Sequence, residues 1–167
     1  AASLAGHQKL GNLVVIYDSN QISIEDDTNI AFTEDLSARY ESYGWHTQTV
    51  DWKKTGNYVE DVRELYEAIE KAKAVTDKPS LITLRTIIGW PSPTKQGSGK
   101  VHGSKLGAEE VAGLKQVLGF DPEQNFQVDE DVLAHTRGYQ AHADEARIER
   151  RAGRADREVA FHGRSGV

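Results

Sequence analysis

The chain has 167 residues, of which 38% are hydrophobic and 28% are charged, and its formal net charge is −6. This length is sufficient for one domain with a buried core. The lack of cysteine excludes disulfides, zinc–thiolate sites and thiol catalysis, and it is compatible with a reducing cytoplasm. Basic residues are dispersed over most of the chain, and no apolar run approaches the length of a membrane span. We therefore expect no nucleic-acid partner and no membrane association.

The start of the chain suggests a missing segment. The sequence contains no methionine. It opens on Ala1-Ala2-Ser3-Leu4-Ala5, which is typical of the middle of a helix that lacks its cap. We therefore expect a fragment, or a chain whose N-terminal part is absent.

Helical and strand patterns alternate through the first half of the chain. The expected elements are a helix over residues 1–9, a strand over 13–17, a helix between the cap Thr33 and Gly44 just past its end, a strand over 46–50, a helix with apolar positions at 62–72 and a strand over 80–88. Thr33 is the expected cap of the second helix, and Asn57 with Glu60 has capping-box spacing before the third. The alternation predicts a parallel α/β sheet with right-handed crossovers.

The second half is less periodic. Residues 89–107 are rich in Gly, Pro and Ser, which predicts a long loop of functional interest. A short helix is expected over residues 107–118, with Glu109 and Glu110 in its first turn, and we expect most acidic side chains to lie on exposed helical faces. Asp129 is the expected cap of a further helix. From about residue 141 the composition indicates a solvated helix or linker that ends in a disordered tail.

A candidate cation site follows the first strand. Asp18-Ser19-Asn20 ends a buried run at the carboxyl edge of the expected sheet, where ligands bind in parallel α/β folds. The Asn20 amide oxygen and the backbone carbonyl of Ile22 suit a hard cation such as magnesium. The alternative is a simple Asx turn, and the spacing alone favours that turn.

The long loop carries a second candidate. His102 is followed by glycine in a basic, Gly-rich loop, an environment suited to gripping an oxyanion such as phosphate. The alternative is an ordinary surface histidine. The topology predicts that the ends of all three strands meet at one crevice, together with Ile88 and the rest of this loop.

Seven sequence blocks occur in a distinctive order: residues 6–13, 17–24, 39–45, 78–82, 86–89, 101–103 and 119–122. In this order and spacing they resemble the transketolase family. The resemblance covers about residues 1–137. It implies the C-terminal part of a thiamine diphosphate-binding domain, with an incomplete doubly wound parallel α/β sheet and flanking helices. Residues 138–167 would then be a divergent helical linker or disordered tail.

The resemblance also implies an activity and a site. Transketolases use thiamine diphosphate and Mg²⁺ or Ca²⁺ to transfer a two-carbon ketol unit between sugar phosphates in the pentose phosphate pathway. By this resemblance, the Asn20 side chain and the Ile22 carbonyl are metal ligands, and Ile22 and Ile88 lie beside the cofactor. His102 contacts the diphosphate near the donor sugar and is the expected catalytic residue. The complete protein would be a cytoplasmic homodimer.

Several family groups have no counterpart in this chain. The Gly-Asp-Gly aspartate that ligates the metal lies upstream of Ala1, and the glutamate that activates the cofactor belongs to a later domain of the partner subunit. Asp26 and Pro91 replace glycines of many relatives. We therefore expect no turnover by the isolated chain and at most weak cofactor binding.

Two other functions remain open from the sequence. One is another thiamine diphosphate enzyme, such as a dihydroxyacetone or deoxyxylulose phosphate synthase. The other is a non-catalytic interaction domain that keeps the fold. Because a truncated sheet exposes apolar edges and faces, we also expect self-association or poor solubility.

Overall fold

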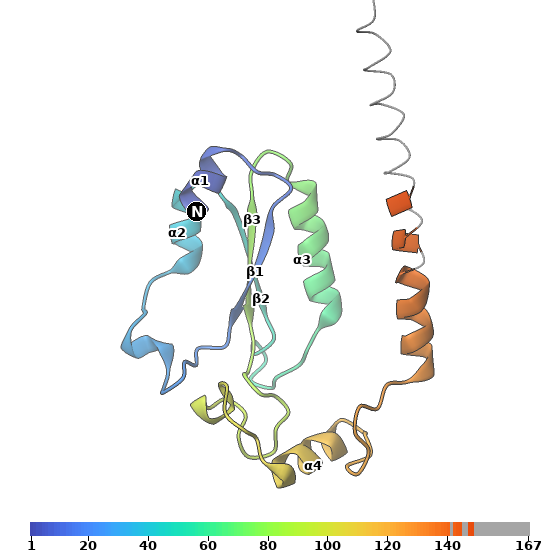
Figure 1. Ribbon diagram of the computed structural model, residues 1–167. Coiled ribbons are helices and arrows are strands. Elements are labelled where there is room, and N and C mark those ends of the chain that lie inside the picture. The colour runs from blue at the N-terminus through green and yellow to red at the C-terminus, as the bar shows by residue number, and fades with distance from the viewer. Residues whose placement is uncertain (141, 145–146, 149–167) are drawn as a thin grey trace, which may run out of the picture. The chain divides into compact units, whose positions relative to one another are not determined.

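The structure is a computed structural model that describes residues 1–140, 142–144 and 147–148. Its contacts divide the chain into two units, Ala1–Pro122 and Glu123–Val167. The elements of the first unit are α1 (Ala2–His7), β1 (Val14–Ser19), the 3-10 helix η1 (Thr28–Ile30), α2 (Leu36–Ser42), β2 (His46–Asp51), α3 (Val62–Ala74), β3 (Ser80–Arg85), the 3-10 helix η2 (Gly99–Val101) and α4 (Ala108–Val117) (Figure 1).

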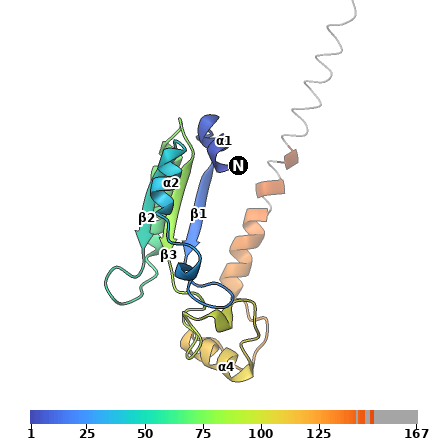
Figure 2. The same ribbon diagram turned by 90° about the vertical axis from the view of Figure 1, so that its left-hand side faces the viewer.

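The three strands form one parallel sheet in the order β1-β3-β2 (Figure 2). Val14 of β1 and His46 of β2 both pair with Ser80, so β3 is the central strand. The two pairings have matching registers, with Ser19 and Asp51 both opposite Arg85, so all three strands end at the same edge of the sheet. The predicted α/β fold with a parallel sheet and flanking helices is confirmed.

Helices cover both faces of the sheet, with α1 and α2 on one face and α3 on the other (Figure 1). Neighbouring residues of β3 serve opposite faces: Leu81 packs with Ala5 and Trp45, and Ile82 packs against α3. The residues buried on the α3 side are Val50, Ala68, Ala72, Ile82 and Leu84. Full burial of a leucine or isoleucine contributes about 1.5–3 kcal/mol, so these two contacts anchor the layers.

The N-caps of two helices differ from the sequence prediction. Helix α2 is capped by Asp35, whose carboxylate accepts from the N–H of Ala38 at 3.0 Å, and the prediction of Thr33 was wrong. Helix α3 is capped by Asp61, not by the Asn57–Glu60 pair. In both cases an aspartate directly precedes the first helical residue, where its negative charge also favours the helix N-terminus.

Strand β3 is shorter than predicted. It ends at Arg85 rather than at Ile88, because β1 and β2 end at Ser19 and Asp51, the partners of Arg85. Among the described residues, no strand pairs with residues 86–88, which therefore begin the long loop that includes η2. Because these residues are not part of the sheet, their backbone can bond within the loop, as the Ile88 carbonyl does with Gly97.

The second unit contains a helix over residues 130–140, directly after Asp129 as predicted. The N–H of Leu133 bonds to the carbonyl of Asp129 at 3.1 Å. Among the described residues, no helix is long and apolar enough to cross a membrane. Most of the linker or tail predicted over residues 138–167 lies outside the described residues, and the predicted domain boundary at residue 137 stays a prediction.

Candidate functional site

The turn after β1 places the predicted cation ligands beside each other in an Asx turn. The side-chain oxygen of Asn20 accepts from the backbone N–H of Ile22 at 3.0 Å, and its amide nitrogen donates to Asp18 at 3.3 Å. Gln21, between the two predicted ligands, has a φ of 64°. This left-handed conformation reverses the chain locally. The Asn20 amide is thus fixed at both ends.

The backbone of Ile22 is held by a short antiparallel bridge to Asp27. The two bonds of the bridge use the carbonyls of Gln21 and Asp26 as acceptors, not that of Ile22. Asn20 retains an amide oxygen with two lone pairs, only one of which the Ile22 N–H requires. Both oxygens are of the type that a hard cation prefers, and such a cation takes about six ligands or more.

The long loop folds back on its own beginning. The N–H of Gly97 bonds to the carbonyl of Ile88 at 2.8 Å. Gly89 has a φ of 68°, and a Cβ atom there would come within 2.9 Å of the Val101 side chain. Glycine is therefore required at residue 89, both for its conformation and for the close approach of η2.

The folded loop also contacts the turn after β1. A Cβ atom on Gly99 would lie 2.8 Å from the carbonyl oxygen of Ile24, so the two backbones touch at this point. A pocket of about 230 Å³ lies at the junction, lined by Asn20, Gln21, Ile22, Asp27, Lys53, Thr86, Ile87 and Gly97. An adjoining pocket of about 490 Å³ extends from Ile22 along η2 to Lys100. The ends of all three strands contribute to the first pocket.

His102 lies at the same edge of the sheet as Asn20. It follows η2 directly, and its N–H bonds to the carbonyl of Gly99 at 3.0 Å, next to the turn after β1. The residue is exposed. Ile88 is half-buried, and its carbonyl accepts a hydrogen bond from Gly97. Of the residues that follow β3, Thr86 and Ile87 line the first pocket, and Ile88 does not. Of the four predicted site residues, Asn20 and Ile22 line the first pocket, whereas Ile88 and His102 line neither of these two pockets.

Glu110 is a feature of this region that sequence reasoning missed. Most acidic side chains were expected on exposed helical faces, but Glu110 is only 9% exposed. Its carboxylate accepts from the N–H groups of Thr94 and Lys95 and from the hydroxyls of Ser92 and Thr94. These hydrogen bonds, led by that from Ser92, lower the pKa of Glu110 to about 2. No periodicity signals such a contact, because its partners lie in an irregular loop.

An aromatic group beside the pocket was also missed. Tyr58 lies between two indoles, with ring centroids 5.0 Å from Trp90 and 6.3 Å from Trp52. Burial, and to a lesser extent the charge of Glu60, raises the pKa of Tyr58 to about 12. The phenol therefore stays neutral at physiological pH. The group joins the residues after β2 to those after β3.

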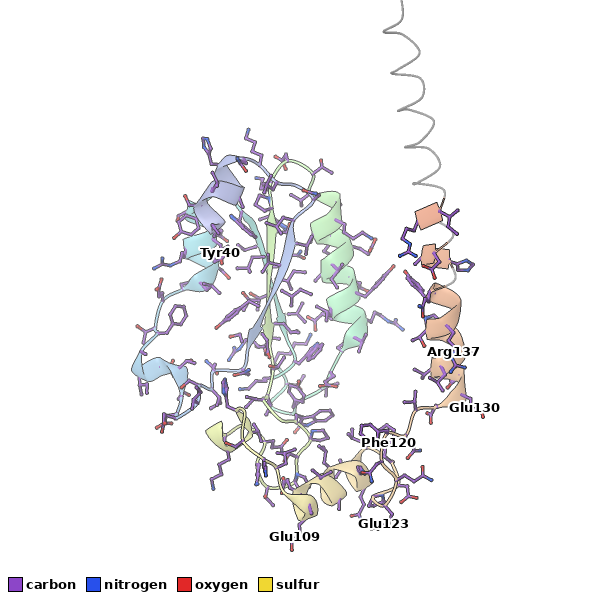
Figure 3. The ribbon with its side chains drawn as sticks, in the orientation of Figure 1. Tyr40, Glu109, Phe120, Glu123, Glu130 and Arg137 are labelled. Atoms are coloured by element: carbon purple, nitrogen blue, oxygen red, sulfur yellow. The ribbon has the colours of Figure 1, made fainter. Side chains whose placement is uncertain are left out.

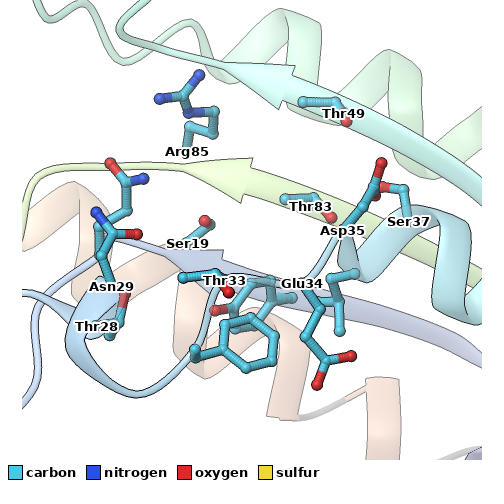
Figure 4. A pocket seen from close by; sticks show the side chains of 14 residues that line it. Ser19, Thr28, Asn29, Thr33, Glu34, Asp35, Ser37, Thr49, Thr83 and Arg85 are labelled. Carbon is cyan, nitrogen blue, oxygen red and sulfur yellow. The ribbon is translucent and has the colours of Figure 1, made fainter.

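A separate polar pocket of about 390 Å³ lies between the sheet and the start of α2 (Figure 4). Ser19, Thr49 and Thr83 line it from the three strands, together with Arg85. The guanidinium of Arg85 is paired with Asp51 at 3.2 Å. The buried hydroxyl of Thr83 has no hydrogen-bond partner among the described residues. None of the predicted site residues lines this pocket.

The sequence profile of one protein family, described as the thiamine diphosphate binding domain of transketolase, matches residues 1–158. The chain belongs to the transketolase family. The transketolase of Mycobacterium tuberculosis is 56% identical over 146 residues, which are 87% of this chain and 20% of that protein. The chloroplastic transketolase of Zea mays is 54% identical over 135 residues, or 81% of this chain and 19% of that protein.

Solved transketolase structures agree with this assignment. The Pichia stipitis enzyme in complex with sedoheptulose 7-phosphate superposes with a TM-score of 0.78 and 42% identity, covering 89% of this chain and 21% of that chain. The Leishmania mexicana transketolase gives a TM-score of 0.76 and 41% identity, covering 90% of this chain and 21% of that chain. The present chain thus spans about a fifth of the length of the transketolases that it matches.

Proposed function

We propose that this chain forms part of a transketolase that transfers a two-carbon ketol unit between sugar phosphates in the pentose phosphate pathway. The observation that carries the proposal is the close approach of the loop that leads to His102 to the segment after β1, at the carboxyl edge of the sheet. Gly99 contacts the backbone of residues 23–25, directly after the Asn20–Ile22 turn, and Gly97 lines one pocket with Asn20 and Ile22. In parallel α/β folds this edge is where ligands bind. Thiamine diphosphate is the cofactor supported by the family.

The cation site is proposed on the chemistry of two oxygens. The Asn20 side chain and the Ile22 carbonyl would ligate Mg²⁺ or Ca²⁺, both of which prefer oxygen ligands. The cation would in turn hold the diphosphate of the cofactor. The described residues contain no cluster of three or more His, Asp or Glu side chains that could hold a metal. The remaining ligands would therefore come from water, the diphosphate and other parts of the complete protein.

His102 is proposed to contact the diphosphate and the donor sugar. As a neutral imidazole it offers one donor and one acceptor nitrogen. At this position it would stabilise developing negative charge or assist proton movement. The Ile22 and Ile88 side chains would supply apolar contact beside the cofactor rings.

When bound, thiamine diphosphate supplies the carbanion chemistry of ketol transfer, and the protein positions it. Sugar phosphates are proposed as substrates because the Pichia stipitis transketolase structures include complexes with fructose 6-phosphate and sedoheptulose 7-phosphate. We further propose a cytoplasmic homodimer as the complete protein. The isolated chain is expected to have no turnover.

The test is a titration of the isotope-labelled chain with thiamine diphosphate and Mg²⁺, followed by NMR, which detects millimolar binding. We expect the amide signals of residues 20–22 and 97–102 to shift together, and only when Mg²⁺ is present. Asn20→Ala should abolish the Mg²⁺-dependent shifts. Shifts that are confined to other parts of the sheet, or that Asn20→Ala leaves unchanged, would contradict the proposal.

A further inference from the structure

The carboxylate of Glu110 binds a short segment of the long loop, residues 92–95. One oxygen accepts from the N–H groups of Thr94 at 2.8 Å and Lys95 at 3.2 Å, as well as from the buried hydroxyl of Ser92. The other accepts from the hydroxyl of Thr94 at 2.7 Å. We call this group of four residues, Glu110, Ser92, Thr94 and Lys95, the Glu110 clamp.

The chemistry of the Glu110 clamp indicates a role in geometry rather than in packing. Burying a carboxylate costs free energy that only good hydrogen bonds offset, and an apolar side chain would fill the same space without that cost. All the donors here are neutral hydroxyl or backbone groups of one short segment. Four directed bonds fix the path of that segment, which an apolar contact would leave free to slide.

The Glu110 clamp is connected to the proposed cofactor site through the loop itself. The Lys95 side chain donates to the carbonyl of Leu106, and the hydroxyl of Ser98 donates to the carbonyl of Lys95 at 2.7 Å. Gly97 is bonded to Ile88, and Gly99 touches the backbone of Ile24. A displacement at Lys95 therefore reaches Gly97, which lines the pocket beside Asn20.

Helix α4 is fitted closely to the same segment. A Cβ atom on Gly113, one turn after Glu110, would lie 3.0 Å from Pro93. Glu110 and Gly113 thus face the loop together, since residues three apart share one side of a helix. Glu109 is exposed and points away from the loop (Figure 3). Glu109 is therefore a suitable control for Glu110, because it lies on the same turn of α4 and does not belong to the Glu110 clamp.

We propose that Glu110 is a positioning residue, whose carboxylate holds residues 92–102 in the conformation that places Gly97 beside the Asn20–Ile22 turn, and sets the path of the loop to His102, for cofactor binding. This inference rests on the proposed function. Glu110 itself acts through the loop backbone.

The experiment compares the wild-type chain with Glu110→Ala, Glu110→Gln, Thr94→Val and the control Glu109→Ala. Amide hydrogen exchange reports on the clamp. In Glu110→Ala we expect the Thr94, Lys95 and Gly97 amides to exchange about tenfold faster or more, on the scale of a lost charge-assisted hydrogen bond, while α3 and β3 stay protected. Glu110→Gln keeps one acceptor oxygen and should be intermediate.

The second readout is the concentration of thiamine diphosphate, with Mg²⁺, at which the signals of residues 20–22 are half shifted. We expect Glu110→Ala to require about tenfold more ligand, Thr94→Val about threefold more, and Glu109→Ala no more than the wild type. A purely structural role would lower the unfolding temperature without changing this concentration. If Glu110→Ala does not fold, Glu110→Gln and Thr94→Val decide the question.

The possible failures are distinguishable. If Glu110→Ala, or its substitutes, loosens the loop but binds the cofactor as the wild type does, the positioning role is wrong and the proposed function stands. If the folded wild-type chain shows no shift at residues 20–22, the proposed function fails and the positioning role fails with it.

Discussion

The hydroxyl of Thr86 donates a hydrogen bond to the carboxylate of Asp18, which joins the end of β3 to the end of β1. The second oxygen of Asp18 accepts from the side-chain amide of Asn20. This amide nitrogen must point toward Asp18, and the amide oxygen is thereby directed to the opposite side. The proposed metal ligand is thus oriented, through Asp18, by a residue that directly follows another strand.

Removing this support should weaken cofactor binding. For Thr86→Val we expect the Mg²⁺-dependent affinity for thiamine diphosphate to fall about three- to tenfold, the equivalent of about 0.5–1.5 kcal/mol for one hydrogen bond. NMR titration measures the effect. Thr47→Val is the control, because it removes a hydroxyl bonded to Glu41 at the start of β2, the opposite end of the sheet. Equal losses in both variants would contradict the prediction.

Acid should loosen the Glu110 clamp. The pKa of Glu110 is lowered to about 2 in the folded chain from its ordinary 4.5, so the folded state favours the carboxylate. Its contribution to stability is therefore present above about pH 4.5 and is lost as the pH falls toward about 2. The stability difference between the wild type and Glu110→Gln should shrink over this range.

Urea unfolding at a series of pH values measures that difference. Glu109→Gln removes a charge from the same turn of α4 and serves as the control. If the wild type and Glu110→Gln lose stability in parallel between pH 6 and pH 3, the carboxylate does not have the assigned role.

The centre of the sheet should tolerate truncation poorly. Ile82 is completely buried against α3, so Ile82→Ala leaves a cavity and should lower the free energy of unfolding by about 2–5 kcal/mol. Ile30→Ala removes the same atoms from a side chain that is 73% exposed, and we expect a change within about 0.5 kcal/mol. Chemical denaturation compares the two variants, and similar losses would contradict the assigned core.

Gly89 should be more sensitive to substitution than a glycine with open space around it. Gly44 has a φ of 84° and free space at its Cβ position, so Gly44→Ala isolates the backbone strain, about 1–2 kcal/mol. Gly89→Ala adds a contact of 2.9 Å with Val101 and should cost more. It should also shift the NMR signals of η2, whereas Gly44→Ala should not. Equal effects would indicate that Val101 moves freely.

The sequence was sufficient for the fold but only partly for the site. The α3 helix and the strands were predictable because their apolar spacing is local and regular. The caps at Asp35 and Asp61 were missed because neighbouring polar residues offered plausible alternatives. The contacts of Glu110 and Thr86 involve partners distant in sequence and leave no periodic signal. The roles of Asn20 and His102 at one site stay predictions, and they rest on the family resemblance.

The central position of β3 has a consequence for folding. Strand β3 is the last of the three strands to leave the ribosome. Both β1 and β2 are hydrogen-bonded to β3 and not to one another. Until residues 80–85 emerge, neither of the two ladders with β3 can form. Such non-local pairing slows folding, since a long stretch of chain must first be closed into a loop. Assembly of the sheet, and with it of the pocket at its edge, should therefore be a single late event.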